Sequence, residues 1–151
     1  MSAPASKARA RWAGHAHEVM TRHGHRAGAA RAAVIEALAA SGCCLSAQEL
    51  ADAARAAGRR VGIASVYRIL ERLHELRLVQ RLELGDGIAR FEALAPDGDH
   101  HHHLVCLECG EVVPFEDPGL ERAIAGTSRR AGFSVVEHDV VLRGHCPACA
   151  A

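Results

Sequence analysis

The sequence has no long hydrophobic run, a single lysine and only 3% aromatic residues among its 151 residues. No apolar stretch approaches the ~18 residues that a membrane-spanning helix requires, so the sequence excludes such a helix. No apolar segment follows the basic residues between Lys7 and Arg11, so we expect no secretory signal and a cytoplasmic protein. What is present, 49% apolar and 24% charged residues, is typical of a folded chain.

The chain has no net charge, but its charges are unevenly distributed. Residues 1–95 carry 14 Lys and Arg against 9 Asp and Glu, whereas residues 96–151 carry 4 against 9. A basic first part joined to an acidic second part indicates an anionic partner for the first part. Chance variation between two small domains is the alternative interpretation.

Six cysteines and eleven histidines are the unusual excess of this composition, and both cluster towards the C-terminus. Because we expect a reducing compartment, these residues favour metal ligation over disulfides.

Helical spacing of apolar residues predicts four helices in the first part, after a frayed arm of about ten residues. They cover about 12–23, a segment around 34–38 that ends near 42, 46–57 and 63–76. Ser46 with Glu49 three positions later is a capping-box signature that marks the start of the third helix. The fourth helix is expected to bury Val66, Ile69, Leu70 and Leu73.

A period-two pattern follows these helices. Residues 79–84 and 88–91, separated by Gly85-Asp86-Gly87, are typical of a β-hairpin. Helices followed by a short ribbon indicate a winged-helix domain, whose last helix can enter a DNA major groove. Residues 95–99 have the composition of a linker. Beyond them we expect strands at 104–107, 112–115 and 135–142 and a helix at 120–131.

Two Cys-x-x-Cys motifs lie in the second part of the chain, Cys106 with Cys109 and Cys146 with Cys149. Together they supply the four thiolates of a closed, structural zinc site. The alternatives are a thioredoxin-like redox pair and cysteines that only pack.

Four consecutive histidines, residues 100–103, lead into the expected strand. Alternate side chains of an extended segment point in opposite directions. His101 and His103 should therefore face one side and His100 and His102 the other, which predicts ligand pairs for two metal sites. A surface histidine-rich loop is the alternative.

Polar residues surround the fourth helix. Arginine can clamp phosphate or guanine, and tyrosine can contact thymine, so this surface is a candidate for DNA binding. A solvated helix face is the alternative. The candidates are Arg59, Arg60, Ser65, Tyr67 and Arg68, with Arg72 nearby.

Three segments, residues 62–70, 100–110 and 144–149, together resemble the ferric uptake regulator family of bacterial metal-dependent repressors. The resemblance implies an α+β chain: a winged-helix DNA-binding domain at 1–95, with an N-terminal arm and a wing hairpin, and a metal-binding α/β dimerisation domain at 96–151. It also implies a homodimer that binds double-stranded operator DNA when it is metal-loaded.

The resemblance further implies three metal sites. The structural zinc site would use Cys106, Cys109, Cys146 and Cys149. The hinge sensor site would use Cys44, Glu92, His101 and His103. A second dimerisation-domain site would use His100, His102, Glu121 and His138. Iron-sensing members usually carry histidines where this chain has Cys43 and Cys44, and often an aspartate in place of His102.

These differences from the iron-sensing members bear on which metal the chain senses. A hinge set with one sulfur and a second set of three imidazoles and one carboxylate favour Zn²⁺ over Mn²⁺, which prefers oxygen ligands. The sequence therefore predicts a zinc-uptake regulator, with an iron, nickel or manganese sensor as the alternative. A zinc enzyme is a remote alternative, because a catalytic zinc needs an open position and a positioned general base. We expect no enzymatic activity.

Overall fold

The computed structural model describes residues 3–94 and 100–150, with side chains from residue 9 onwards. The chain divides into two compact units, residues 1–99 and residues 100–151. They are called the N-terminal and C-terminal units below. The predicted linker at 95–99, with the predicted domain boundary at its start, lies outside the described residues.

Four helices make up most of the N-terminal unit: α1 (Ala3–Arg22), α2 (Ala29–Ala40), α3 (Ala47–Ala56) and α4 (Ile63–Glu75). The prediction of a frayed arm over the first ten residues is wrong, because α1 already begins at Ala3. The reason is local: this segment is rich in alanine, the best helix former, and its only proline, Pro4, sits in the first turn, where proline is tolerated. The other three helices lie close to their predicted positions.

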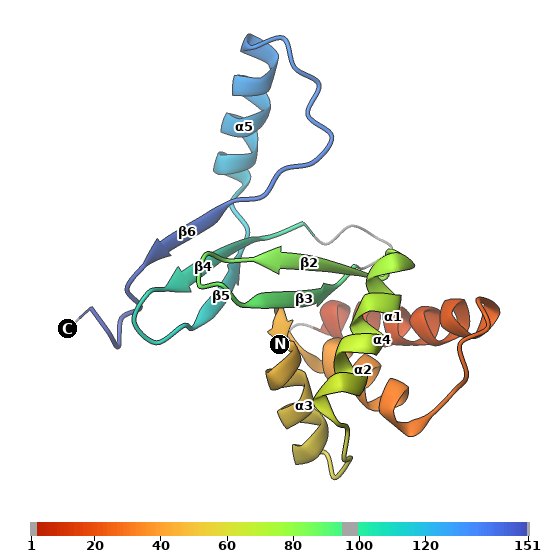
Figure 1. Ribbon diagram of the computed structural model, residues 1–151. Coiled ribbons are helices and arrows are strands. Elements are labelled where there is room, and N and C mark those ends of the chain that lie inside the picture. The colour runs from red at the N-terminus through yellow and green to blue at the C-terminus, as the bar shows by residue number, and fades with distance from the viewer. Residues whose placement is uncertain (1–2, 95–99, 151) are drawn as a thin grey trace. The chain divides into compact units, whose positions relative to one another are not determined.

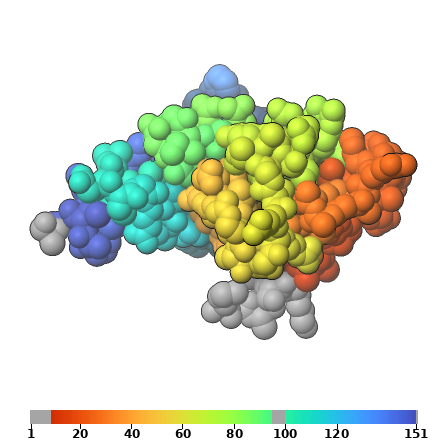
Figure 2. Space-filling view, turned by 60° about the horizontal axis from the view of Figure 1, so that its bottom comes forward, coloured from red at the N-terminus to blue at the C-terminus, as the bar shows by residue number. Residues whose placement is uncertain are grey.

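The core of this unit lies between the helices and the first strands of the sheet. The indole nitrogen of Trp12 donates a hydrogen bond of 2.9 Å to the carbonyl of Leu78, which ties α1 to the segment after α4. α3 and α4 lie side by side (Figures 1 and 2). The largest fully buried apolar side chains are Trp12, Val34, Ile35, Leu50, Val66, Leu70, Leu73, Val79 and Leu84.

The start of α3 confirms the predicted capping box. Ser46 Oγ accepts a hydrogen bond from the backbone N–H of Glu49, and the Glu49 carboxylate accepts one from the backbone N–H of Ser46. This reciprocal pair satisfies two N–H groups that a helix start leaves without partners. The cap fixes the chain between α2 and α3, where Cys43 and Cys44 lie.

A three-stranded sheet completes the N-terminal unit, in the order β1 (Leu45–Ser46), β3 (Ala89–Ala93), β2 (Val79–Glu83). The predicted hairpin is confirmed as β2 and β3. The sequence did not predict β1, because two residues are too short to show a period. β1 pairs with β3 in the register Leu45 to Phe91, and the same register continued by one residue sets Cys44 opposite Glu92.

The C-terminal unit has a sheet in the order β5 (Val112–Phe115), β4 (His102–Cys106), β6 (Val141–Gly144), and one helix, α5 (Pro118–Arg130), which stands off one end of the sheet (Figure 1). The predicted strand at 135–142 is wrong for residues 135–140, which form no strand. β6 pairs only with β4, and their register begins at His103 and Val141. Val135 and Val136 therefore have no strand beside them, and Val136 is 97% exposed.

The C-terminal unit buries little apolar surface. Among its described residues, Val105 and Cys106 are the only buried hydrophobic side chains, and no residue of α5 is buried. Leu104, Val113 and Leu142, which lie side by side in the sheet register, are 42–48% exposed. No helix in the described part of the chain is long and apolar enough to cross a membrane.

Candidate metal centres and DNA-binding surface

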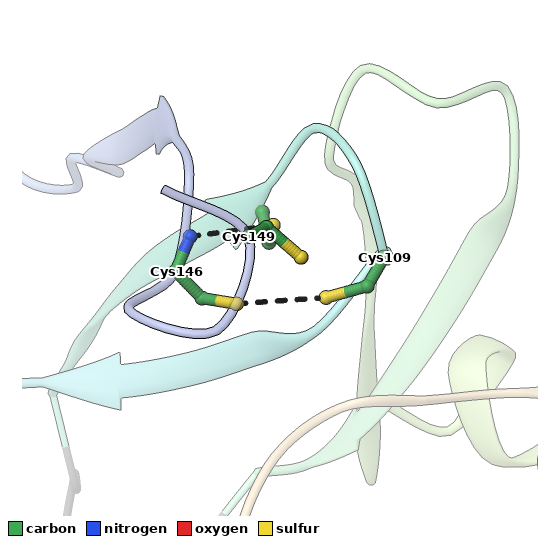
Figure 3. Close-up of side chains that lie close together, drawn as sticks. Cys109, Cys146 and Cys149 are labelled. Atoms are coloured by element: carbon green, nitrogen blue, oxygen red, sulfur yellow. Dashed lines mark hydrogen bonds between the residues drawn. The ribbon is translucent and has the colours of Figure 1, made fainter. Parts of the chain in front are cut away.

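Four cysteine sulfurs converge at one end of the C-terminal sheet (Figure 3). Cys106, Cys109, Cys146 and Cys149, called the four-cysteine cluster below, have their Sγ atoms within 4.8 Å of one another. The Sγ atoms of Cys109 and Cys146 are 3.8 Å apart. A metal bound by four thiolates in a tetrahedron needs this kind of clustering.

Two tight loops and one parallel strand pair build the four-cysteine cluster. The first loop closes with a hydrogen bond of 3.0 Å from Gly110 N–H to the carbonyl of Cys106, and Gly110 adopts φ +75°, a conformation that favours glycine. The second closes from Cys149 N–H to the carbonyl of Cys146 at 2.9 Å. β6 runs parallel to β4 with Cys106 opposite Gly144, so the second loop meets the first. The parallel pairing explains how motifs 36 residues apart come together.

The local hydrogen bonds give these sulfurs different acidities. The backbone N–H groups of Cys109 and Cys146 donate to Cys106 Sγ and lower the pKa of the Cys106 thiol to about 6. Hydrogen bonds with the thiols of Cys146 and Cys109 raise the pKa of Cys149 to about 12. None of the six cysteines, all of which lie in the described residues, forms a disulfide. The two loops thus favour the thiolate of Cys106 and the protonated thiol of Cys149, which would lose its proton on binding a metal.

A second group of ligand atoms lies beside α5. His100, His102, Glu121 and His138, called the histidine–glutamate cluster below, also converge within 4.8 Å. His102 Nε2 lies 2.6 Å from a Glu121 oxygen, and His138 Nε2 lies 3.2 Å from the other. His100 Nε2 and His138 Nε2 are 3.0 Å apart. Glu121 comes from the first turn of α5, whose N-cap is Asp117.

The donor set of the histidine–glutamate cluster fits a transition metal. Three imidazole nitrogens and one carboxylate oxygen point at one another, an arrangement that zinc and its neighbours accept. His102 is 1% exposed, and its Nδ1 has no hydrogen-bond partner among the described residues. The hydrogen bond with His102 lowers the pKa of Glu121, so the carboxylate is ionised and ready to bind a cation.

The four residues of the predicted hinge site belong to different units. His101 and His103 are in the C-terminal unit, with ring centroids 5.0 Å apart. His100 and His102 turn instead towards the histidine–glutamate cluster, as the alternation along an extended segment predicts. Cys44 and Glu92 are in the N-terminal unit, next to each other across the β1–β3 register. The hinge site stays a prediction.

Two further residues of the N-terminal unit lie beside Cys44 and Glu92. Cys43 Sγ is 3.8 Å from Cys44 Sγ, and this contact together with burial raises the pKa of the Cys44 thiol well above its ordinary value. Gln80 Nε2 donates a hydrogen bond of 3.0 Å to a Glu92 oxygen. The sequence pattern assigned no role to Cys43 and did not single out Gln80, whose only signal is its position opposite Glu92 in the hairpin.

The outer face of α4 carries the candidate DNA contacts. Val66, Leu70 and Leu73 face the core, whereas Tyr67 is 51% exposed. Arg68 donates a hydrogen bond of 2.9 Å to Ser65 Oγ, one turn earlier on the same helix. This face therefore presents an aromatic hydroxyl and a cation to the surface.

Further arginines flank this helix. Arg60 is exposed, whereas Arg59 forms an ion pair of 3.1 Å with Glu36 of α2. A hollow of about 340 Å³ beside α4 is lined by Arg26, Arg68 and Arg72, together with His25 and Arg31. The sequence did not identify this hollow, because Arg26 and Arg72 are far apart along the chain. Its charge suits the phosphate backbone of a nucleic acid.

Comparisons with known proteins decide the family. The profile of the ferric uptake regulator family matches residues 22–143. The chain belongs to the ferric uptake regulator family. It is 37% identical over 105 residues to the ferric uptake regulation protein of Bordetella parapertussis, covering 70% of this chain and 74% of that protein.

Solved structures of the family have the same fold. The Vibrio cholerae ferric uptake regulator is 30% identical with a TM-score of 0.75, covering 85% of this chain and 98% of that one. The Helicobacter pylori regulator is 26% identical with a TM-score of 0.82, covering 95% and 94%, and is described as having three functional metal-binding sites. The chain is therefore a metal-responsive, DNA-binding transcription regulator of α+β fold, and not an enzyme.

Proposed function

We propose that this chain is a homodimeric repressor that binds operator DNA when Zn²⁺ fills its regulatory sites. The observation that carries the proposal is the histidine–glutamate cluster, in which three imidazoles and a carboxylate converge in addition to the separate four-sulfur cluster. We place its two domains at residues 1–95 and 96–151 and its action in the cytoplasm, where operator DNA is available.

The four-cysteine cluster is the structural zinc site in this proposal. Four sulfurs suit Zn²⁺, and a set that uses every position for protein atoms leaves none for substrate. When bound, the ion would cross-link the loops that follow β4 and β6. The chain's own part is to bring the sulfurs together and to hold one of them, Cys106, as a thiolate.

A second copy of the chain covers the C-terminal sheet in this proposal. The exposed row of Leu104, Val113 and Leu142, together with the small core of this unit, supports a dimer. A unit that buries so little apolar surface gains stability when a partner removes that surface from water.

Two regulatory sites follow from the donor sets. The hinge site would take Cys44 and Glu92 from the N-terminal unit and His101 and His103 from the C-terminal unit. An ion held by all four restricts how the two units move, and so favours one spacing of the two α4 helices in a dimer. The second site would be the histidine–glutamate cluster.

The donor atoms of the two regulatory sites favour one metal, and the names of the matched relatives favour another. One sulfur in the hinge set and three imidazoles in the second set suit Zn²⁺. The matched relatives are named for iron, which makes Fe²⁺ the second candidate. Softness of the ligands is the reason for our choice, since Mn²⁺ and Mg²⁺ select oxygen-rich sites. Ni²⁺ also accepts imidazole-rich sites.

On DNA, Tyr67 and Arg68 are the proposed base contacts, and Arg59, Arg60 and Ser65 the proposed phosphate contacts. Arg59 is paired with Glu36, so a phosphate would have to replace that carboxylate. Tyr67 and Arg68 lie on the exposed face of α4, which supports their assignment.

The deciding experiment is DNA binding at buffered free-metal concentrations. Protein holding one Zn²⁺ per chain in the four-cysteine cluster is titrated with Zn²⁺, anaerobic Fe²⁺, Mn²⁺ and Ni²⁺. The DNA comes from upstream of metal-uptake genes. We expect Zn²⁺ to produce the gel shift at the lowest free concentration. If Fe²⁺ produces a gel shift at a free concentration at which Zn²⁺ produces none, the regulatory metal is Fe²⁺ instead.

A further inference from the structure

Cys43 and Cys44 are adjacent cysteines at the end of the α2–β1 connection, and the β1–β3 register, continued by one residue, sets Cys44 opposite Glu92. We propose that Cys43 is a second thiolate ligand of the hinge site, so that the N-terminal unit presents two sulfurs and a carboxylate to a thiophilic divalent cation. This inference rests on the proposed function, which assigns Cys44 and Glu92 to that site.

The separation of the two sulfurs supports joint ligation. A tetrahedral ion about 2.3 Å from each sulfur sets neighbouring sulfurs about 3.8 Å apart. Cys43 Sγ and Cys44 Sγ are 3.8 Å apart. Cys109 Sγ and Cys146 Sγ, which come from different Cys-x-x-Cys motifs of the four-cysteine cluster, show the same 3.8 Å separation. The pair is thus already spaced as one edge of such a tetrahedron.

Local hydrogen bonds hold the loop that carries the pair. The backbone N–H of Cys43 donates to Ser41 Oγ at 3.1 Å, and the Ser41 hydroxyl in turn donates to the carbonyl of Cys43. On the other side, the capping box at Ser46 anchors the start of α3. Cys43 is half-buried and Cys44 is buried.

The carboxylate beside the pair is also held in place. Gln80 Nε2 donates to one Glu92 oxygen at 3.0 Å, across a directly opposed pair of β2 and β3. A hydrogen bond that orients a ligating carboxylate is a common feature of metal sites. Gln80 is therefore a positioning residue in this proposal.

Two sulfurs change the selectivity expected of the site. Soft thiolates select zinc-like ions, whereas Mn²⁺ prefers oxygen ligands. The ligand class is thus a thiophilic divalent cation, Zn²⁺ or Cd²⁺. Cys43 sets this preference, because removing it leaves one sulfur among oxygen and nitrogen donors.

Cobalt reports the number of thiolates directly. Full-length protein with Zn²⁺ in the four-cysteine cluster is titrated with Co²⁺, and the near-ultraviolet thiolate-to-cobalt absorbance is measured per bound Co²⁺. The histidine–glutamate cluster has no sulfur, so this band arises from Cys43 and Cys44 alone. We expect Cys43→Ser to leave about half of the band, and Cys43→Ser with Cys44→Ser to abolish it.

The possible outcomes distinguish a failure of this inference from a failure of the proposed function on which it rests. A full-strength band in both Cys43→Ser and Cys43→Ala overturns the inference and leaves Cys44 as the only sulfur ligand. The absence of any band in the unmodified protein overturns the hinge site itself, and the inference with it. His101→Ala is the matched control: it removes a proposed nitrogen ligand, so the band per bound Co²⁺ should persist while affinity falls. Zinc content and helical circular dichroism confirm that each variant is folded.

Discussion

The two units of this regulator differ in the interactions that stabilise each of them. The N-terminal unit has a conventional core in which Trp12, Leu50 and Leu70 are at most 1% exposed. The C-terminal unit instead brings eight metal-ligating side chains into two clusters and buries few apolar ones. A unit of the first kind folds through apolar burial, whereas we propose that the second kind depends on bound ions and a partner chain.

Removing the structural ion is the strongest test of this comparison. Structural zinc in small domains contributes about 10–16 kcal/mol of apparent binding energy, more than the net stability of most domains. Cys149→Ser should therefore unfold the C-terminal unit and abolish the dimer, while the N-terminal helices keep a cooperative melting transition. Analytical ultracentrifugation and circular dichroism measure the two effects.

Cys43→Ser is the matched control for that experiment, because Cys43 lies outside the four-cysteine cluster. It should leave the dimer and the Zn²⁺ of the four-cysteine cluster unchanged. A Cys149→Ser protein that remains dimeric with an unaltered melting curve would contradict the structural role of the cluster.

Truncating a buried side chain of the N-terminal unit tests the same comparison between the two units. Leu70 is fully buried in the N-terminal unit, and removing a buried leucine side chain costs about 2–5 kcal/mol. Leu70→Ala should lower the denaturant midpoint of the N-terminal unit and weaken DNA binding, with the zinc content intact.

Val113→Ala is the counterpart in the C-terminal unit. Val113 is 42% exposed on the sheet face, so its truncation should weaken the dimer rather than the fold of one chain. Equal losses of unfolding stability from the two variants would mean that the units do not differ as described.

The sequence predicted those features that depend on neighbouring residues. The capping box of Ser46 and Glu49 is complete within four positions, and the hairpin turn is marked by its two glycines. The spacing of the four cysteines, in two Cys-x-x-Cys motifs, predicted their cluster. Each is a local pattern that tertiary contacts did not override.

The features that the sequence missed depend on pairing between distant segments. Residues 135–140 have strand-like composition but no strand beside them, because β6 meets β4 only from Val141 onwards. β1 exists because β3 is available to pair with it, and Gln80 matters only through its position opposite Glu92. No local pattern could have identified these three.

Substitutions on α4 should have smaller effects that are confined to the N-terminal unit. Losing a base contact costs about 1–3 kcal/mol of DNA-binding energy and relaxes specificity. Tyr67→Ala should do this without changing the melting curve, because Tyr67 is half-exposed. Fluorescence anisotropy with operator and scrambled DNA measures the loss of discrimination.

Arg60→Ala should behave differently, because a phosphate contact is the same on every sequence. It should weaken binding to both DNAs alike and reduce the slope of log affinity against log salt by about 0.9 for each chain of the dimer. The hypothesis for α4 fails if Tyr67→Ala leaves operator affinity and discrimination intact.

The smallest expected effect is a difference in acidity within the four-cysteine cluster. In the metal-stripped protein the pKa of Cys106 is about 6 and that of Cys149 about 12, against 9.0 for an ordinary thiol. The lowered pKa of Cys106 means that its thiolate favours the folded unit above pH 9, and this contribution is lost as pH falls towards 6. The raised pKa of Cys149 acts in the opposite direction: its contribution is present below pH 9 and is lost as pH rises towards 12.

Alkylation with iodoacetamide, followed by peptide mass spectrometry, measures this difference. Because the thiolate is the nucleophile, a short pulse given directly after chelation, before the metal-free C-terminal unit unfolds, should label Cys106 with a midpoint near pH 6, while Cys149 stays unreactive at neutral pH. In denaturant the two midpoints should merge near the ordinary value, since the backbone N–H groups that stabilise the Cys106 thiolate are lost. Equal alkylation midpoints for Cys106 and Cys149 in this pulse would mean that the two loops hold their arrangement only around an ion. The C-terminal unit would then depend on metal even more strongly than its small apolar core indicates.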